Sequence, residues 1–331
     1  MDDDRPGTPF DWGDSTESYS QDLAESRALC RSVRIRKPPA ADIPDASARS
    51  GLKGCDAEAL YYGIGMKADP VRARQCAFVE METGEETIFG GRVMLMTAYA
   101  NGVGARRDLD LAIHYACTLE PAAPFEYDGR VLHLAKMKQE ASPDPFHFCD
   151  DTTSGYAGGL CAMHQARLEQ ARREARLTRL AARFPTRSRA LFTALRKTQD
   201  NYADSRGENE TDFRGTLRVA FAVEAEEAVA DEFLDTLERL SKGTLRSYTN
   251  SAFRKADARL NQRYRQLLDS EALEDMGLGK DGVRRAQRAW LAYRDAFIAF
   301  AAVAFPAVSR DSIAGNLTDQ RAGTLKEMAE L

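Results

Sequence analysis

The segment RRAQRAWLAYRD (284–295) decides the fold, because it reads as the middle of a long amphipathic helix. The apolar side chains that fall near one face at helical spacing are Ala286, Trp290, Phe297 and Phe300. Such a stripe is typical of a helix packed in a core. We expect the helix to span 282–305 and to end at Pro306. Arg294 and Asp295, on the neighbouring face, are expected to form a buried or half-buried ion pair or a helix-end contact, not a site.

A weaker copy of this segment, TQDNYADSRG (198–207), lies earlier in the chain. The matched positions are 88 apart: Gln199 and Gln287, Tyr202 and Trp290, Arg206 and Arg294, Asp231 and Asp319, Thr236 and Thr324, Leu237 and Leu325. Upstream, ARLEQ (166–170) matches ARLNQ (258–262). Self-similarity of this kind indicates duplicated structural units. We therefore predict two tandem helical units, at residues 146–243 and 244–331.

The repeated unit resembles the LprI-type lysozyme-inhibitor domain. The resemblance rests on a Cys-led amphipathic helix, the ARLNQRYRQLL segment, the AQRAWLAYRD helix and a short closing helix. Its motif residues here are Gln287, Trp290, Tyr293, Arg294 and Asp295. The second copy lacks the cysteines that the family often places after the tryptophan helix, and the first copy keeps Cys149 and Cys161 but lacks the tryptophan. The resemblance implies a helical, exported bacterial envelope protein that blocks a peptidoglycan hydrolase, without identifying the contact residues.

A second repeat lies in the N-terminal half. LYYGIGMKADPVRARQCA (60–77) aligns with YANGVGARRDLDLAIHYA (99–116). The shared turn residues are Gly63, Gly65 and Asp69 in the first copy and Gly102, Gly104 and Asp108 in the second. A glycine that ends a helix, a second glycine in the turn and an Asp that caps the next helix predict a helical hairpin. The pattern resembles the Sel-one-like repeat, a relative of the tetratricopeptide repeat, which implies an interaction scaffold without chemistry of its own.

Six cysteines, all between residues 30 and 161, form an even and clustered set. Such a set predicts disulfides in an oxidising compartment, although six buried thiols in a cytosolic helical protein are the alternative. The favoured pairs are Cys149–Cys161, which closes a short turn-rich loop, then Cys55–Cys76, and Cys30–Cys117 by elimination. The N-terminal residues have no signal-peptide pattern, so the chain is either cytoplasmic or a mature form whose precursor carried a signal and a possible lipid anchor.

We divide the chain into an acidic disordered leader (1–19), a Sel-like region with disulfides (20–145) and the two tandem units. Residues 121–129 are expected to be a linker, the next helices to begin at Cys161 and Arg187, and RGENE (206–210) to form a turn before a helix over 211–241. Residues 161–197 are strongly basic and 208–238 strongly acidic. Pairing between consecutive helices explains this pattern better than a nucleic-acid or lipid surface.

The composition excludes several classes of protein. The chain has 43% hydrophobic and 29% charged residues, an ordinary globular balance, and its net charge of −5 indicates no general nucleic-acid partner. No apolar run reaches the length of a membrane span. No catalytic constellation, phosphate loop or cofactor motif is present, so no enzyme and no cofactor is predicted. The four histidines have no metal-ligand spacing, although clustering of His133, His147 and His164 in space is left open.

The predicted fold class is all-α, with a helical-hairpin repeat region followed by tandem helical-bundle units. The predicted function is inhibition of a lysozyme-like or other peptidoglycan hydrolase in the periplasm or envelope, with an immunity protein as one form of such an inhibitor. A loop would occlude the cleft and place a cationic side chain between its two carboxylates. The candidate loops are 149–161, 204–212 and 270–283. The alternatives are a Sel-repeat adaptor for envelope or signalling proteins and an enzyme of unrecognised type, which would need a polar pocket.

Overall fold

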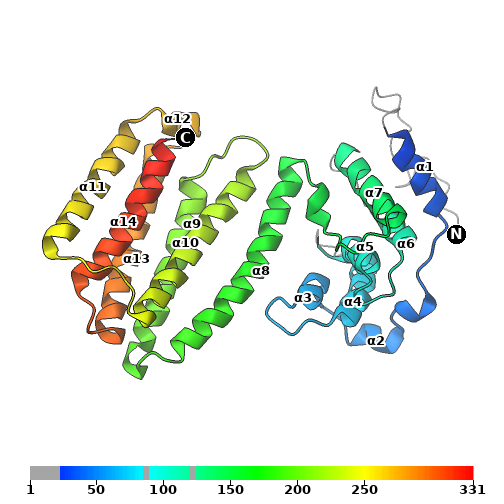
Figure 1. Ribbon diagram of the computed structural model, residues 1–331, viewed down its shortest axis with the longest axis horizontal. Helices are drawn as coiled ribbons and strands as arrows, with labels where there is room; N and C mark the ends of the chain where they lie inside the picture. Colours follow the sequence, from blue (N-terminus) through cyan, green and yellow to red (C-terminus); the bar gives the residue numbers. More distant parts are fainter. Residues whose placement is uncertain (1–22, 85–88, 120–123, 331) are drawn as a thin grey trace. The chain divides into compact units, whose positions relative to one another are not determined.

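The computed structural model describes residues 23–84, 89–119 and 124–330. The predicted acidic leader lies outside this range. The fold is all-α: the described residues form 14 α-helices, with 74% helix and no strand (Figure 1). The chain divides into two compact units, Met1–Leu168 and Glu169–Leu331, and the boundary falls within helix α8 (Gly155–Ala181). Each unit has its own hydrophobic core.

The first unit is built around two helical hairpins. Helices α3 (Ala57–Tyr62) and α4 (Pro70–Thr83) form one hairpin, and α5 (Gly91–Asn101) and α6 (Leu109–Ala116) form the next. Helix α7 (Pro124–Gln139) packs on α6, and α1 (Ala24–Val33) packs on both α6 and α7. Shorter elements complete the unit: η2 (Ala40–Asp42), α2 (Ala46–Ser50) and η3 (Phe148–Asp151).

Three disulfides brace this unit: Cys30–Cys117, Cys55–Cys76 and Cys149–Cys161. These are the three pairs favoured from the sequence, and the protein has no free cysteine. The first bond joins α1 to the end of α6 and closes the longest loop, with a sequence separation of 87. Covalent closure of long loops restricts the unfolded chain most, so this bond is expected to stabilise the unit most strongly.

The second unit is a helical bundle. Its helices after α8 are η4 (Thr186–Ser188), α9 (Arg189–Asn209), α10 (Arg218–Lys242), α11 (Asn250–Asp269), α12 (Ala272–Asp275), α13 (Lys280–Ala304) and α14 (Arg310–Ala329). Helix α9 packs on α13 and α10, and α11 packs on α14 (Figure 1). As the sequence predicts, Trp290, Phe297 and Phe300 of α13 lie in the core, where they are almost fully buried. Aromatic rings from α9, α10 and α13 meet there in tilted, stacked and edge-to-face arrangements.

Charges of the basic and acidic segments pair, but mainly between α8 and α10, which are not consecutive in the chain as predicted. Arg173 of α8 forms ion pairs with Glu227 and Asp231 of α10, and Arg176 binds Glu238. Arg196 of α9 donates to Glu174. Part of the charge of the basic segment 161–197 is therefore paired with the acidic segment 208–238 within the bundle.

Three predicted boundaries are wrong. The supposed linker 121–129 contains the start of α7, because Pro124 is its first residue and proline is compatible with a first helical turn. Helix α8 starts six residues before Cys161, where Ser154 Oγ accepts from the backbone N–H of Ala157 at 3.2 Å. The RGENE segment is mostly helical. Gly207 lies inside α9 at a point where α10 approaches closely. A Cβ atom at this position would overlap the side chain of Glu226, so glycine allows the approach.

Candidate functional site

Two of the three candidate loops meet at one end of the second unit. The connection after α9 runs over 210–217, and the connection between α11 and α13, which holds α12, runs over 270–279. A Cβ atom on Gly277 would lie 3.4 Å from Cγ of Arg214. Arg285 donates to the Asn209 side chain at 2.7 Å. We call these two connections the loop end. The predicted loop 204–212 is thus displaced, because residues 204–209 belong to α9. The loop 149–161 belongs to the first unit.

A buried ion pair anchors the loop end. The guanidinium group of Arg321 in α14 donates to both carboxylate oxygens of Glu210, at 2.7 and 2.5 Å, and both side chains are 0% exposed. The same group donates to Tyr202 Oη at 3.3 Å and to Gln287 Oε1 at 2.9 Å. Burial alone would lower the pKa of Arg321, but the Glu210 carboxylate raises it above its ordinary value. The last helix therefore fixes the point where the chain leaves α9.

The sequence pattern did not predict that Arg321 and Glu210 are functionally placed residues. Glu210 lies in a polar stretch that reads as a solvated turn, and Arg321 is one of many arginines on the helices. Neither position has a local signal, because the pairing joins residues 111 positions apart. Of the motif residues, Gln287 proves to be a partner of Arg321. This contact links the predicted tryptophan helix to the buried pair.

The remaining motif residues of α13 lie in or beside the core. Tyr293 stacks on Tyr202 with ring centroids 5.7 Å apart, and its burial raises its pKa well above the ordinary value. Arg294 lies over the Trp290 ring at 5.1 Å and pairs with Asp295 at 3.1 Å. Arg294 is largely buried and Asp295 is exposed. This is a half-buried ion pair within the helix and not at its end.

An exposed edge extends from the loop end into α10. We call residues 212–221 (DFRGTLRVAF) the 212–221 edge. Four of its large apolar side chains are exposed to solvent, by 38–46%: Phe213, Leu217, Val219 and Phe221. Arg214 projects beside them and is held by Asp212, with Nη2 and Oδ2 2.9 Å apart. Arg218 donates to the carbonyl of Gly215 at 3.1 Å. Apolar rings that flank arginines on an open surface are typical of protein-binding contacts.

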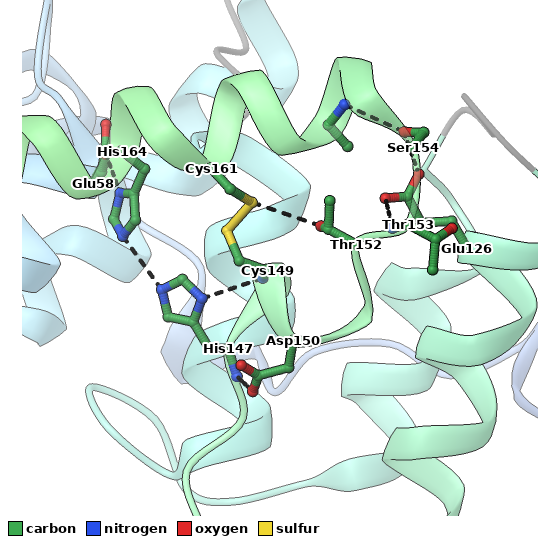
Figure 2. Close-up of a disulfide and its surroundings, with 11 residues drawn as sticks. Glu58, Glu126, His147, Cys149, Asp150, Thr152, Thr153, Ser154, Cys161 and His164 are labelled. Carbon is green, nitrogen blue, oxygen red and sulfur yellow. Dashed lines mark hydrogen bonds and ion pairs between the residues drawn. A yellow bond between two sulfur atoms is a disulfide. The ribbon is translucent and has the colours of Figure 1, made fainter. Parts of the chain in front are cut away.

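The first unit contains a second polar cluster, around Cys149–Cys161 (Figure 2). His147 Nε2 lies 3.3 Å from His164 Nε2, and the other ring nitrogen of His164 binds Glu58. His147 Nδ1 accepts from the backbone N–H of Cys149 at 3.2 Å. His133 is not part of this cluster, because it pairs with Asp151 at 3.1 Å. The structure therefore brings two of the three histidines together.

Within the part of the chain that the structure describes, these two histidines are not gathered with a third potential metal ligand. Among the described residues, the one group of three potential ligands gathered closely is Cys55, Cys76 and Glu80. Its two sulfurs form a disulfide and are not thiolates. A solvent pocket of about 160 Å³ lies beside that disulfide, lined by residues that include Asp56 and Glu80.

The repeated glycines and aspartates of the first unit adopt the same geometry in both hairpins. Gly63, Gly65, Gly102 and Gly104 have positive φ angles between 66° and 79°. The side chains of Asp69 and Asp108 accept from the backbone N–H groups of Arg72 and Leu111, at 3.1 and 3.0 Å. Their own N–H groups donate to the carbonyls of Leu60 and Tyr99 at 2.8 and 2.9 Å. The two turns therefore make the same capping and backbone hydrogen bonds at matched positions.

The second unit is therefore a helical bundle with a buried ion pair and an exposed basic and apolar edge. The sequence model of one family, Lysozyme inhibitor LprI, matches residues 236–330. One copy of this domain is found, and neither a second copy nor Sel repeats are detected. The matched family consists of inhibitors and not enzymes, and it covers part of the chain. No curated protein and no solved structure matches the sequence.

Two further observations bear on location. Three disulfides are consistent with an extracytoplasmic compartment. Among the helices of the described ranges, none combines the length and apolar character needed to cross a bilayer.

Proposed function

We propose that the second unit inhibits a lysozyme-like peptidoglycan hydrolase in the bacterial periplasm or envelope. The match of residues 236–330 to the LprI lysozyme inhibitors carries this proposal. The disulfides agree with an oxidising compartment. The net charge of −5 would steer the protein toward a basic hydrolase. A role as an immunity protein against a rival's hydrolase would use the same contact.

The 212–221 edge is the proposed contact surface. A glycosidase cleft contains two carboxylates that flank the scissile bond, with apolar and polar walls that bind sugar. Arg214 offers a planar cation that can bind carboxylates, and Phe213 and Leu217 beside it offer rings and methyl groups for the walls. The buried Arg321–Glu210 pair fixes the root of this segment, so little ordering is needed on binding.

Residues 149–235 are proposed to be a diverged copy of the matched domain. The helix order α8, α9, α10 parallels α11, α13, α14. Asp231 of α10 accepts from an arginine of α8, and the matched Asp319 of α14 accepts from Arg259 of α11. The contact between α9 and α13 then joins the two copies, as the stacked rings of Tyr202 and Tyr293 illustrate.

The test is inhibition of peptidoglycan lysis by the full-length protein, titrated against a panel of muramidases and amidases. Stoichiometric loss of lysis is expected with one of them. Arg214→Ala and Phe213→Ala are each expected to weaken inhibition by about tenfold or more, as for central contact residues. Arg310→Ala is the matched control, because Arg310 is an exposed arginine at the start of α14 and is not at the loop end. Normal lysis with every hydrolase at excess protein would contradict the proposal.

The alternative function is an adaptor that binds non-enzymatic envelope or signalling proteins through the hairpins of the first unit. The bond-by-bond equivalence of the two turns favours it, since such hairpins form binding scaffolds in repeat proteins. The two functions predict different effects of the Arg214→Ala substitution on partner binding. An adaptor would keep its partner after Arg214→Ala, whereas an inhibitor would lose affinity for its hydrolase.

A further inference from the structure

We propose that His147 and His164 form a proton-sensitive latch, which holds residues 147–152 against α8 and α3 at neutral pH and releases them on mild acidification. The latch lies wholly in the first unit and does not depend on the proposed inhibition. Its parts come from the residue before η3 (His147), from α8 (His164) and from α3 (Glu58), as Figure 2 shows.

The hydrogen bonds of the chain assign the proton on each imidazole. The backbone N–H of Cys149 can only donate, so His147 Nδ1 must accept and its proton is on Nε2. That proton points at His164 Nε2, 3.3 Å away, which must therefore be the acceptor. His164 then carries its proton on Nδ1 and donates it to Glu58. Each imidazole is thus neutral, with one defined tautomer.

A proton added to either ring has no acceptor. On His147 it would enter at Nδ1 and face the N–H of Cys149. On His164 it would enter at Nε2 and face the N–H of His147. In both cases two donors point at each other in a site from which water is largely excluded, because the His164 side chain is 1% exposed. The contact between the rings must then open, which removes the cap on η3 as well.

The surrounding charges do not compensate for that proton. Glu58, on α3, faces the opposite nitrogen of His164, and its charge is already shared with Arg167 of α8, which also binds Asp56. Asp150 of η3 accepts from the backbone N–H of His147. The remaining neighbours are rings: Phe89 stacks on His164 at 4.1 Å, and Tyr62 meets it edge-on at 4.8 Å. Tyr62 is neutral, because burial raises the pKa of its hydroxyl.

The protonation equilibria agree with the geometry. Burial lowers the pKa of His164 to about 4. Burial, followed by the neighbouring His164, lowers the pKa of His147. The neutral rings of the closed latch therefore survive at neutral pH, and a released ring near its ordinary pKa would take up a proton as the medium becomes acidic.

Release is confined to a short segment. The Cys149–Cys161 disulfide keeps the segment attached to α8. At its far end, Glu126 of α7 accepts from the N–H of Thr153 at 3.1 Å and from Ser154 Oγ at 2.9 Å. Acid therefore loosens residues 147–152, while Cys149 stays tethered to α8 and Asp151 stays paired with His133, without unfolding the helix that follows.

Hydrogen exchange followed by mass spectrometry tests the latch in the full-length protein. The probe peptide covers 147–161, and a histidine-free peptide from α13 serves as an internal reference. After correction for the intrinsic effect of pH, exchange in the probe should rise roughly 30-fold from pH 7.5 to pH 5 if release restores an ordinary histidine pKa. The reference should not change. Equal behaviour of probe and reference would overturn the proposal.

Two variants and one spectrum complete the test. His147→Asn keeps an acceptor for the Cys149 N–H but cannot titrate, so the pH dependence of the probe should become smaller and the remainder should come from His164. His114→Gln removes a partly buried histidine of α6 and should leave the dependence intact. On the unmodified protein at pH 7.5, nitrogen NMR should place protons on His147 Nε2 and on His164 Nδ1. A dependence in His147→Asn as large as in the unmodified protein, or the opposite tautomer at either ring, would refute the latch.

Discussion

Arg321 and Glu210 form a bidentate ion pair in which both side chains are completely buried, although 111 residues separate them in sequence. The pair connects the last helix to the residue that ends α9. A buried charge that loses its partner is far more costly than the pair itself is stabilising. This relationship makes the loop end dependent on the C-terminal helix.

Removal of one member of this pair should destabilise the second unit strongly. Glu210→Ala or Arg321→Ala is expected to lower the free energy of unfolding by about 3–5 kcal/mol, because each removes the bidentate partner of a buried charge, and Glu210 would keep only the longer contact with Arg206 at 3.7 Å. Replacement of both residues by Leu and Met together should cost much less. Urea unfolding of the single and double variants measures the coupling. Lys326→Ala is the control, since Lys326 pairs with Glu330 on the exposed face of the same helix and should change stability by less than about 1 kcal/mol.

The disulfides should rank by the length of chain that they close. Cys30→Ser with Cys117→Ser opens a loop of separation 87 and is expected to cost about 4–5 kcal/mol of unfolding free energy. Cys149→Ser with Cys161→Ser opens a separation of 12 and should cost about 3 kcal/mol. Denaturant unfolding of the two paired variants gives the comparison. The opposite order would show that native packing, and not loop closure, dominates.

Two glycines with similar backbone angles should respond differently to alanine. Gly65 and Gly104 have φ angles of 71° and 79°, so alanine is strained at both by about 1–2 kcal/mol. A Cβ atom at 65 meets open space, whereas one at 104 would overlap the carbonyl of Pro70. Gly104→Ala should therefore cost about 1–3 kcal/mol more than Gly65→Ala. Thermal unfolding checks the difference, and equal losses would place the whole cost in backbone strain.

Stability of the first unit should fall with pH below neutrality. The pKa of His164 in the folded protein, about 4, is lower than its ordinary value, so the unfolded chain binds the proton more tightly. This contribution is complete above about pH 6.5 and is lost as pH falls toward 4. At pH 5 the loss is about 2 kcal/mol relative to pH 7.5. Urea unfolding at the two pH values measures it, and His164→Gln should reduce the difference.

Features that depend on local spacing could be predicted from the sequence. In each hairpin the glycines predict positive φ angles and the Asp a few residues later predicts an N-cap. Both features are present in both turns. The stripe of α13 predicted which side chains are buried, Trp290 included. The ends of the helices were harder to predict from the sequence. The glycine-rich start of α8 has low helix propensity, and packing of the first turns together with the Ser154 cap outweighs it.

The sequence by itself determined the all-helical class, the duplicated hairpins and the short-loop pair Cys149–Cys161, because periodicity, turn chemistry and short loops are local properties of a chain, whereas Cys30–Cys117 was reached by elimination. The tertiary structure decided which polar groups meet. Arg321 with Glu210, and His164 with Glu58, are contacts over 111 and 106 positions, and nothing near either residue distinguishes it from a solvated charge. Burial changes the role of such groups, since a charge removed from water must find a partner, and that partner is chosen by how the helices pack.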